Sequence, residues 1–192
     1  MAKAGKTGVT ENTPKRIMFG AGTIHKGLTC TDGTWNFEAT LVGATSGGSS
    51  LSIKPEIYNV EADGALVAAK GLTVKTGEVA ELKVNMLELT PDVIKAALIA
   101  KTGTSDDSNY DLYESKANIE EGDYWDNIAF VGKTLEGKNI IAILDNALCT
   151  SGMELGGENK KESVGEYTFA CHADLTSDLD TLPYHIYYPK AN

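Results

Sequence analysis

The segment Gly132–Lys138 has the residue spacing of a phosphate-binding loop, in which backbone N–H groups and a lysine bind nucleotide phosphates. Asn139 stands where serine or threonine would hold magnesium. The run that follows, NIIAIL, is typical of a strand, so no helix N-terminus would face a phosphate. We therefore interpret Gly132–Lys138 as a β-hairpin turn. Gly20 and Gly22 lack the third glycine and the following helix of a dinucleotide site.

Asp107, Asn109 and Asp111 begin like a calcium-binding loop, because alternating carboxylate and amide oxygens suit that ion. Leu112 then occupies the position where calcium loops need glycine, and Asn118 the position where they need glutamate. We interpret this segment as a solvated acidic loop.

The histidines and cysteines form no recognisable catalytic or metal-binding pattern. Cys171 and His172 are adjacent, and adjacent side chains on a strand point to opposite faces, so they cannot easily share a metal ion. No nucleophile has a base close to it in the sequence, although catalytic triads are assembled in space. We expect a protein that is not an enzyme and that holds no cofactor or metal.

Length and charge narrow the possible classes of protein. The chain has 192 residues, which suggests one domain, and its 17 basic and 27 acidic residues give a net charge of −10. Because phosphate contacts need clustered lysine and arginine, this balance argues against a nucleic-acid-binding surface and against anionic membranes. The N-terminus lacks the apolar run of a secretory signal, and no stretch has the ~18 apolar residues of a membrane span. Three widely spaced cysteines then suggest free thiols in a reducing compartment.

The segment Lys101–Asp126 is strongly acidic. Its only cations are Lys101 and Lys116. A solvated face is the usual interpretation of such a run, and a surface that repels a polyanion is the alternative. The acidic residues are Asp106, Asp107, Asp111, Glu114, Glu120, Glu121, Asp123 and Asp126.

One strand followed by one helix organises the rest of the chain. Residues 80–86 alternate between apolar and polar side chains, which is the period of a half-buried strand. Thr90 can cap a helix that begins at Pro91. Lys101 and Gly103 provide a C-terminal charge and a stop, so we expect the main helix at about residues 91–101.

The other segments have the patterns of strands and loops. Asn139–Leu148 leaves neither face polar and should be buried on both sides. Gly43–Ser50 has the composition of a flexible loop, and Leu175–Leu182 that of one helical turn. We expect a flexible N-terminal arm at residues 1–13 and a single domain at 14–192. The expected strands are Lys15–Ile24, Trp35–Leu41, Leu51–Glu61, Ala65–Val74, Tyr110–Ala117, Tyr124–Val131, Asn139–Leu148, Val164–His172 and Tyr184–Tyr188.

Four stretches of the first half carry a resemblance to a known family. They are TPKRIMFGAGTIHK (Thr13–Lys26), LVGATSGGSSLSIKPEI (Leu41–Ile57), VEADGALVAAKG (Val60–Gly71) and LELTPDVI (Leu87–Ile94). Together they resemble the major tail tube proteins of long-tailed, non-contractile (siphovirus-type) phages and prophages of Gram-positive bacteria. The second half of the chain matches only in its strand-rich character.

The resemblance implies a mainly β protein with a two-sheet sandwich or barrel and one flanking helix. It implies subunits that form hexameric rings, which stack into the hollow tube through which DNA leaves the capsid. The partners would be further copies of the chain and other tail proteins, such as tape-measure, terminator and distal tail proteins. DNA would pass through without specific binding, and an acidic lumen would let it slide. The protein would lie in the virion tail, after assembly in the host cytoplasm, and not at a membrane.

Two sets of residues are the candidate sites of such a tube protein. We expect the first set at a subunit or ring interface: Gly43, Ala44, Thr45, Ser46, Gly47, Gly48, Ser49 and Ile99. The glycine- and serine-rich residues have no side chains to pack on their own domain, and Ile99 should lie on the outer side of the helix. We expect some of the second set to face the lumen: Glu78, Glu81, Glu120, Glu121 and Asp123.

Two other classes of protein remain open. A tube-forming protein of a bacteriocin or secretion apparatus would have the same architecture and the same self-assembly. A monomeric β-sandwich that binds sugars or surfaces would instead expose aromatic side chains on one face. Rings or tubes of the purified protein in an electron microscope would exclude the monomeric module.

Overall fold

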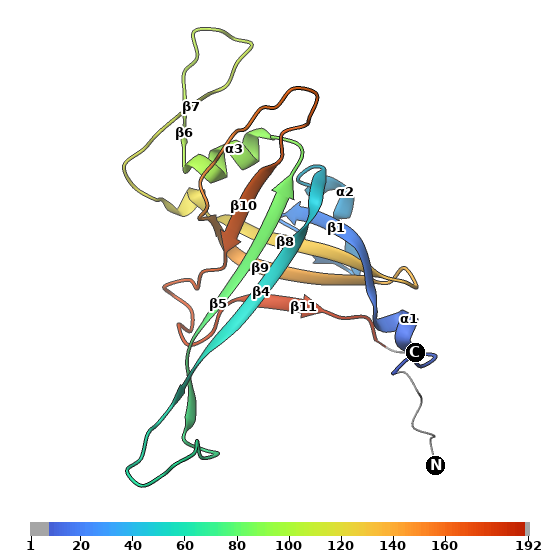
Figure 1. Cartoon of the computed structure of the whole chain (residues 1–192). Coiled ribbons are helices and arrows are strands. Elements are labelled where there is room, and N and C mark those ends of the chain that lie inside the picture. Colours follow the sequence, from blue (N-terminus) through green and yellow to red (C-terminus); the bar gives the residue numbers. More distant parts are fainter. Residues whose placement is uncertain (1–7, 191–192) are drawn as a thin grey trace.

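The computed structural model describes residues 8–190, and this part of the chain is mainly β, as expected (Figure 1). Residues 1–7 of the expected N-terminal arm lie outside the described residues. The strands are β1 (Met18–Lys26), β2 (Cys30–Thr31), β3 (Thr34–Trp35), β4 (Thr45–Asn59), β5 (Thr73–Met86), β6 (Lys101–Gly103), β7 (Leu112–Glu114), β8 (Trp125–Thr134), β9 (Asn139–Cys149), β10 (Gly165–Ala170) and β11 (Tyr184–Tyr187). The helices are α1 (Thr13–Arg16), α2 (Phe37–Thr40), α3 (Pro91–Leu98) and the 3-10 turn η1 (Glu121–Asp123).

The principal sheet is antiparallel, with the strand order β1-β8-β9-β10-β5-β4. β11 pairs with β9 beside this path. Figure 1 shows β8 and β9 crossing the diagonal strands β10, β5 and β4 at a steep angle. The two small hairpins, β2–β3 and β6–β7, stand apart from this sheet.

β9 pairs with strands that run in two different directions, β8 and β11 in one and β10 in the other, because its own direction changes near Asn146. The first part of β9 pairs with β11, whereas Leu148 and Cys149 pair with β10. Asn146 has a φ of 47°, a left-handed conformation that asparagine tolerates better than most residues. Leu144 and Ala147 both enter the main core, although their odd spacing would place them on opposite faces of a regular strand.

Two apolar clusters occupy opposite faces of β8 and β9. The larger cluster joins α3 to the inner faces of β5, β8, β9 and β10, and includes Leu82, Tyr167 and Phe169. The smaller cluster contains Ile141 and Ile143, together with the partners Leu28, Ala129, Val131, Trp35 and Phe37. The expectation that Asn139–Leu148 is buried on both sides is therefore confirmed in its central residues.

The expected strand Trp35–Leu41 is wrong. Trp35 ends the short strand β3, and Phe37–Thr40 forms one helical turn instead. Trp35 and Phe37 pack on the smaller cluster and Asn36 between them is exposed, but the alternation stops there, because Ala39 and Leu41 are exposed and Thr40 is buried. A short turn and a strand both satisfy that pattern, so tertiary contacts decide between them.

The β4–β5 hairpin differs most from the expected elements. β4 begins at Thr45, and Gly43–Ser50 is therefore largely strand rather than loop. The expected strand Ala65–Val74 is mostly the hairpin loop, because β5 starts only at Thr73. β5 also continues through Thr76 and Gly77, next to the point where its register with β4 shifts.

α3 confirms the main helix but ends earlier than expected. Thr90 caps it by accepting a hydrogen bond from the Val93 N–H at 3.4 Å. The helix ends at Leu98 rather than at residue 101, and Lys101 and Gly103 belong to β6. Among residues 8–190 no helix exceeds the eight residues of α3, and none is long and apolar enough to cross a membrane.

Several smaller expectations are settled by the same structure. The hairpin turn at Gly132–Lys138 is confirmed, since the Thr134 N–H donates to the Lys138 carbonyl at 2.9 Å. The expected strand Tyr110–Ala117 is limited to β7, and Leu175–Leu182 contains turns but no helix. All three cysteines are free, with Cys30 exposed and the other two buried.

Candidate functional site

The expected interface residues Gly43–Ser49 lie at the start of β4, on the edge of the principal sheet. Thr45 pairs with Met86 and Ser49 with Val84, and the register shifts between them. This bulge contains Gly47 and Gly48, whose φ values of 81° and 85° suit glycine. The prediction of a flexible loop at Gly43–Ser50 is therefore wrong. Residues with small or no side chains can still form a strand, because strand pairing uses backbone groups.

Two contacts fix the residues before this bulge. The Ala44 N–H donates to Glu88 Oε2 at 3.2 Å, and the Ala44 carbonyl accepts from the Leu87 N–H at 2.9 Å. Removing Gly43–Ser50 would therefore remove part of the sheet. Among residues 8–190, the outer edge of β4 pairs with no other strand, so it remains open to a partner.

Ile99 lies at the C-terminal cap of α3 and not on its outer side. Its φ of 48° and ψ of 51° are left-handed, which is unusual for a β-branched residue. The Ile99 N–H donates to the Ala96 carbonyl and the Ala100 N–H to the Lys95 carbonyl, which is a Schellman motif. Ile99 is half-buried, and Leu98, at 44 % exposure, is the open apolar side chain here. The helical projection that placed Ile99 outside is wrong because the helix has already ended.

Glu78 and Glu81 lie on opposite faces of β5. Glu78 points to the core side, where its carboxylate accepts hydrogen bonds from Lys75 at 2.7 Å and from the Tyr184 hydroxyl at 3.3 Å. Glu81 belongs to the outer face, opposite Ser52 of β4. Because alternate residues of a strand face opposite sides, the two carboxylates cannot line one surface.

The outer face of β4, β5 and β10 is a broad polar surface. Leu51 and Ile53 pack inward against the main core, so the intervening residues of β4 face outward. Lys83 and Glu166 form an ion pair of 2.6 Å across this face. We call it the polar face; it contains Ser50, Ser52, Lys54, Glu81, Lys83, Asn85, Glu166 and Thr168.

Asp123 is buried and paired within its own chain. It is 7 % exposed, and its carboxylate binds the Lys116 ammonium at 2.6 Å and the Glu120 N–H at 2.7 Å. Burial alone would raise the pKa of Asp123, but the hydrogen bonds and the Lys116 charge outweigh it and lower the pKa. The expectation that Asp123 presents a free charge to a lumen is therefore wrong, whereas Glu120 and Glu121 are exposed.

The sequence did not indicate the length of the β4–β5 hairpin beyond the sheet. β10 pairs with β5 only from Glu81 to Met86, so the rest of the hairpin is a ribbon of two strands. We call residues 54–79 the arm. Leu66 and Val67 at its tip are 98 % and 80 % exposed. Exposed apolar side chains also continue along the ribbon, at Ile57, Tyr58, Val60, Leu72, Val74 and Val79.

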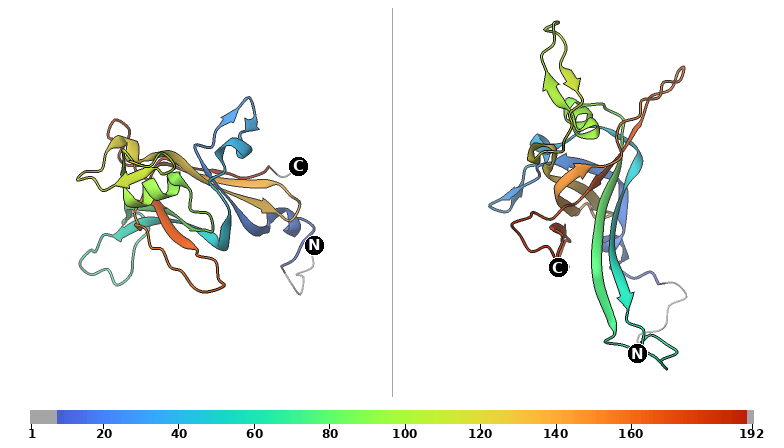
Figure 2. Two further views of the ribbon diagram at one scale, coloured as in Figure 1. Left: turned by 90° about the horizontal axis from the view of Figure 1, so that it is seen from above. Right: turned by 90° about the vertical axis from the view of Figure 1, so that its left-hand side faces the viewer.

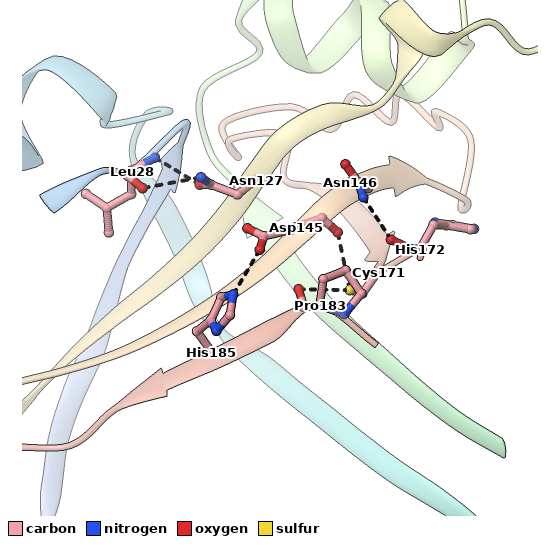
Figure 3. A network of polar contacts seen from close by, with 8 residues as sticks. All are labelled: Leu28, Asn127, Asp145, Asn146, Cys171, His172, Pro183 and His185. Atoms are coloured by element: carbon pink, nitrogen blue, oxygen red, sulfur yellow. Dashed lines mark hydrogen bonds and ion pairs between the residues drawn. The ribbon is translucent and has the colours of Figure 1, made fainter. Parts of the chain in front are cut away.

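A polar network holds the C-terminal segment on β9 (Figure 3). The Cys171 thiol donates to the carbonyls of Asp145 at 3.2 Å and Pro183 at 3.5 Å. Burial, and next the Asp145 charge, raise the pKa of Cys171 to about 12, so this thiol is a structural donor rather than a nucleophile. His185 and Asp145 form a contact of 3.1 Å on the same strand pair.

Among residues 8–190, no group of three His, Cys, Asp or Glu side chains could hold a metal ion. Cys171 is buried beside Pro183, and the His172 ring lies against Tyr124, at 5.4 Å between ring centroids.

A scan against known protein families finds no match for the chain, and a search of curated proteins finds none either.

Proposed function

We propose that this chain is a structural protein that assembles with copies of itself into rings stacked as the hollow tail tube of a siphovirus-type phage. The observation that carries the proposal is the arm. An isolated two-stranded ribbon is marginally stable in water, and an exposed apolar tip gains stability when another surface covers it. A second copy of the same chain is a sufficient partner for such a surface.

The open edges of the sheet support the same proposal. Among residues 8–190, no strand pairs with the outer edge of β4, and the outer edge of β1 pairs only through the isolated bridge between His25 and Leu41. Unpaired edges pair readily with another chain, and closure of a ring is one way to cover them. The resemblance of the four N-terminal stretches to tail tube proteins is the reason for proposing stacked rings rather than another kind of assembly.

The polar face supports the role of a conduit. It carries two lysines and two glutamates among short serine, threonine and asparagine side chains. A surface without a basic cluster gives DNA no site at which several phosphates could be held. In this proposal DNA passes without specific binding, and tape-measure, terminator and distal tail proteins contact the tube. Assembly takes place in the host cytoplasm, and the product lies in the virion tail.

The alternative tube of a bacteriocin or secretion apparatus predicts the same surfaces. A monomeric sugar- or surface-binding module would need an aromatic platform. The strongly exposed aromatic side chains lie instead on separate elements: Phe19 on β1, Tyr58 on β4, Tyr110 before β7, and Tyr187 and Tyr188 at the C-terminus.

Electron microscopy of the purified protein in negative stain tests the proposal. The wild type should form rings or tubes. The double variant Leu66→Ser/Val67→Ser should stay monomeric with an unchanged melting temperature, because two fully exposed side chains contribute little to the monomer. Leu155→Ser/Leu175→Ser is the matched control, since both leucines are exposed and lie in other loops. A monomeric wild type at all concentrations would refute the proposal, and tubes of the tip variant would refute the role of the arm.

A further inference from the structure

A cationic groove lies where α1, the β8–β9 turn and the C-terminal segment meet. Its charged lining consists of Lys15, Arg16, Lys138 and Lys190, and no acidic side chain of the described residues lines it. Asn12, Tyr188 and Pro189 complete the wall. On a protein with a net charge of −10, four cations in one groove are a local reversal of sign.

The cations of this groove form no ion pair among residues 8–190. Elsewhere on the surface lysines do find carboxylates: Lys26 pairs with Asp92, Lys75 with Glu78, Lys83 with Glu166, Lys101 with Glu114, Lys116 with Asp123 and Lys161 with Glu158. The groove therefore concentrates positive charge whose cations have no carboxylate of the described chain within ion-pairing distance, although Glu11 and Glu136 occur in the same two segments.

The β6–β7 hairpin presents the opposite charge. Its loop carries Asp106, Asp107 and Asp111, and no cation occurs between Lys101 and Lys116. Asp107 is occupied in the loop itself, where it accepts hydrogen bonds from the backbone and side chain of Asn109 at 2.9 and 2.7 Å. Asp106 and Asp111 are exposed, and no described side chain forms an ion pair with either.

The groove and the acidic hairpin lie far apart in the molecule. In Figure 1 and in the left view of Figure 2, β6–β7 extends beyond α3 on one side, and α1 and the segment after β11 lie on the other side. The two charges therefore cannot meet within one chain. A second copy in the same orientation can bring its acidic hairpin to the groove, and that contact leaves another hairpin and another groove open.

We propose that the cationic groove binds the β6–β7 hairpin of a second copy of this chain, in a head-to-tail contact. This inference rests on the proposed self-assembly and names one of its contacts, which differs from the arm. Complementary charge at such a contact fixes orientation and speeds association, and it weakens as salt screens the exposed groups. Assembly should therefore begin at lower protein concentration in low salt than in high salt.

A charge exchange measured by sedimentation velocity tests the contact. Arg16→Glu/Lys138→Glu replaces two of the three exposed cations of the groove and leaves its lining without net charge, and Asp106→Lys/Asp111→Lys makes the hairpin loop cationic. Each double variant should need at least about tenfold more protein to assemble at low salt, because the attraction between groove and hairpin is lost. The quadruple variant, and a mixture of the two double variants, should regain assembly, since the introduced glutamates of the groove then meet the introduced lysines of a hairpin.

Lys160→Glu/Lys161→Glu is the matched control, with the same change in net charge on an exposed loop away from the groove. Circular dichroism should give the same melting curve for every monomer. If the groove variant assembles like this control, the inference is overturned while the proposed function stands. If the quadruple variant does not recover, the hairpin is not the partner of the groove. A wild type that stays monomeric overturns both proposals.

Discussion

Asp123 illustrates how one carboxylate can serve the fold although its sequence neighbours suggest a charged surface. Its side chain accepts the Glu120 N–H, and the Glu120 side chain binds the Asp123 N–H in return, which is a capping box around η1. Lys116 pairs with both carboxylates, at 2.6 Å to Asp123 and 3.0 Å to Glu120. The pKa of Lys116 is raised, chiefly by its hydrogen bond to Asp123. The triad therefore ties η1 to the segment after β7.

Asp123→Ala should lower the free energy of unfolding by about 1 kcal/mol from the lost capping interaction alone. Glu121→Ala, in the same turn but exposed, should change it little. Because the folded pKa of Asp123 lies below its ordinary value of 3.8, its contribution is present above that pH and is lost as pH falls through the folded pKa. Urea unfolding at pH 7 and near pH 3 should show the difference between wild type and Asp123→Ala shrinking in acid. A constant difference would contradict the assigned pKa direction.

At the scale of elements, β1 shows how glycine determines a strand's shape. β1 pairs with β8, but the register shifts between Phe19 and Thr23. Gly20 and Gly22, within this irregular stretch, both have positive φ, at 95° and 72°. A Cβ on Gly22 would lie 2.5 Å from the Phe130 ring, whereas a Cβ on Gly20 would meet nothing within 4 Å. Gly22 therefore allows β1 to approach the core as well as to bend.

Gly22→Ala and Gly20→Ala form a matched pair for this element. Both variants carry the cost of a positive φ, but only Gly22→Ala also forces Phe130 to move. We expect Gly22→Ala to be less stable than Gly20→Ala by about 1–3 kcal/mol, the usual cost of overpacking. Thermal or urea unfolding of the two variants measures the difference. Equal stabilities would show that the Phe130 ring moves aside at no cost.

Over the whole molecule, charge is uneven, and different surfaces carry different net charge. The groove is cationic, the β6–β7 hairpin and the region of Glu120 and Glu121 are acidic, and the polar face is balanced. If a conduit for DNA exists, the polar face is the surface of this chain best suited to line it, because its side chains are short and its cations are few. Glu81 lies on that face and Glu121 does not.

Glu81→Lys should therefore affect the passage of DNA, while Glu121→Lys should not. Each added lysine on the wall of a narrow pore can bind DNA phosphates and release counterions, which stabilises a state in which the DNA is held in place. Particles with either variant should assemble, since single exposed charges contribute little to folding. We expect slower DNA ejection from Glu81→Lys particles, with the defect relieved by higher salt. Normal ejection from them would place the polar face outside the channel wall.

Local sequence patterns were sufficient to predict the elements for which a pattern allows one conformation. α3 follows from Thr90, Pro91 and the apolar residues after them, and the strand around Ile141–Leu144 follows from an unbroken apolar run. The hairpin turn before Lys138 likewise needs only local geometry. These features depend on neighbours in the chain, and the residues that form them are close in sequence.

The positions of the remaining candidate residues depend on how the chain folds in three dimensions. Thr45–Ser49 form strand because β5 provides backbone partners, and Ile99 is a cap because α3 ends in a left-handed residue at that position. Asp123 is buried because the turn between β7 and β8 brings Lys116 to its carboxylate. The cationic groove joins α1, the β8–β9 turn and the C-terminus, which lie far apart in sequence. Strand pairing and the path of the chain through space leave no pattern among neighbouring residues, and for this reason the sequence could not place these sites.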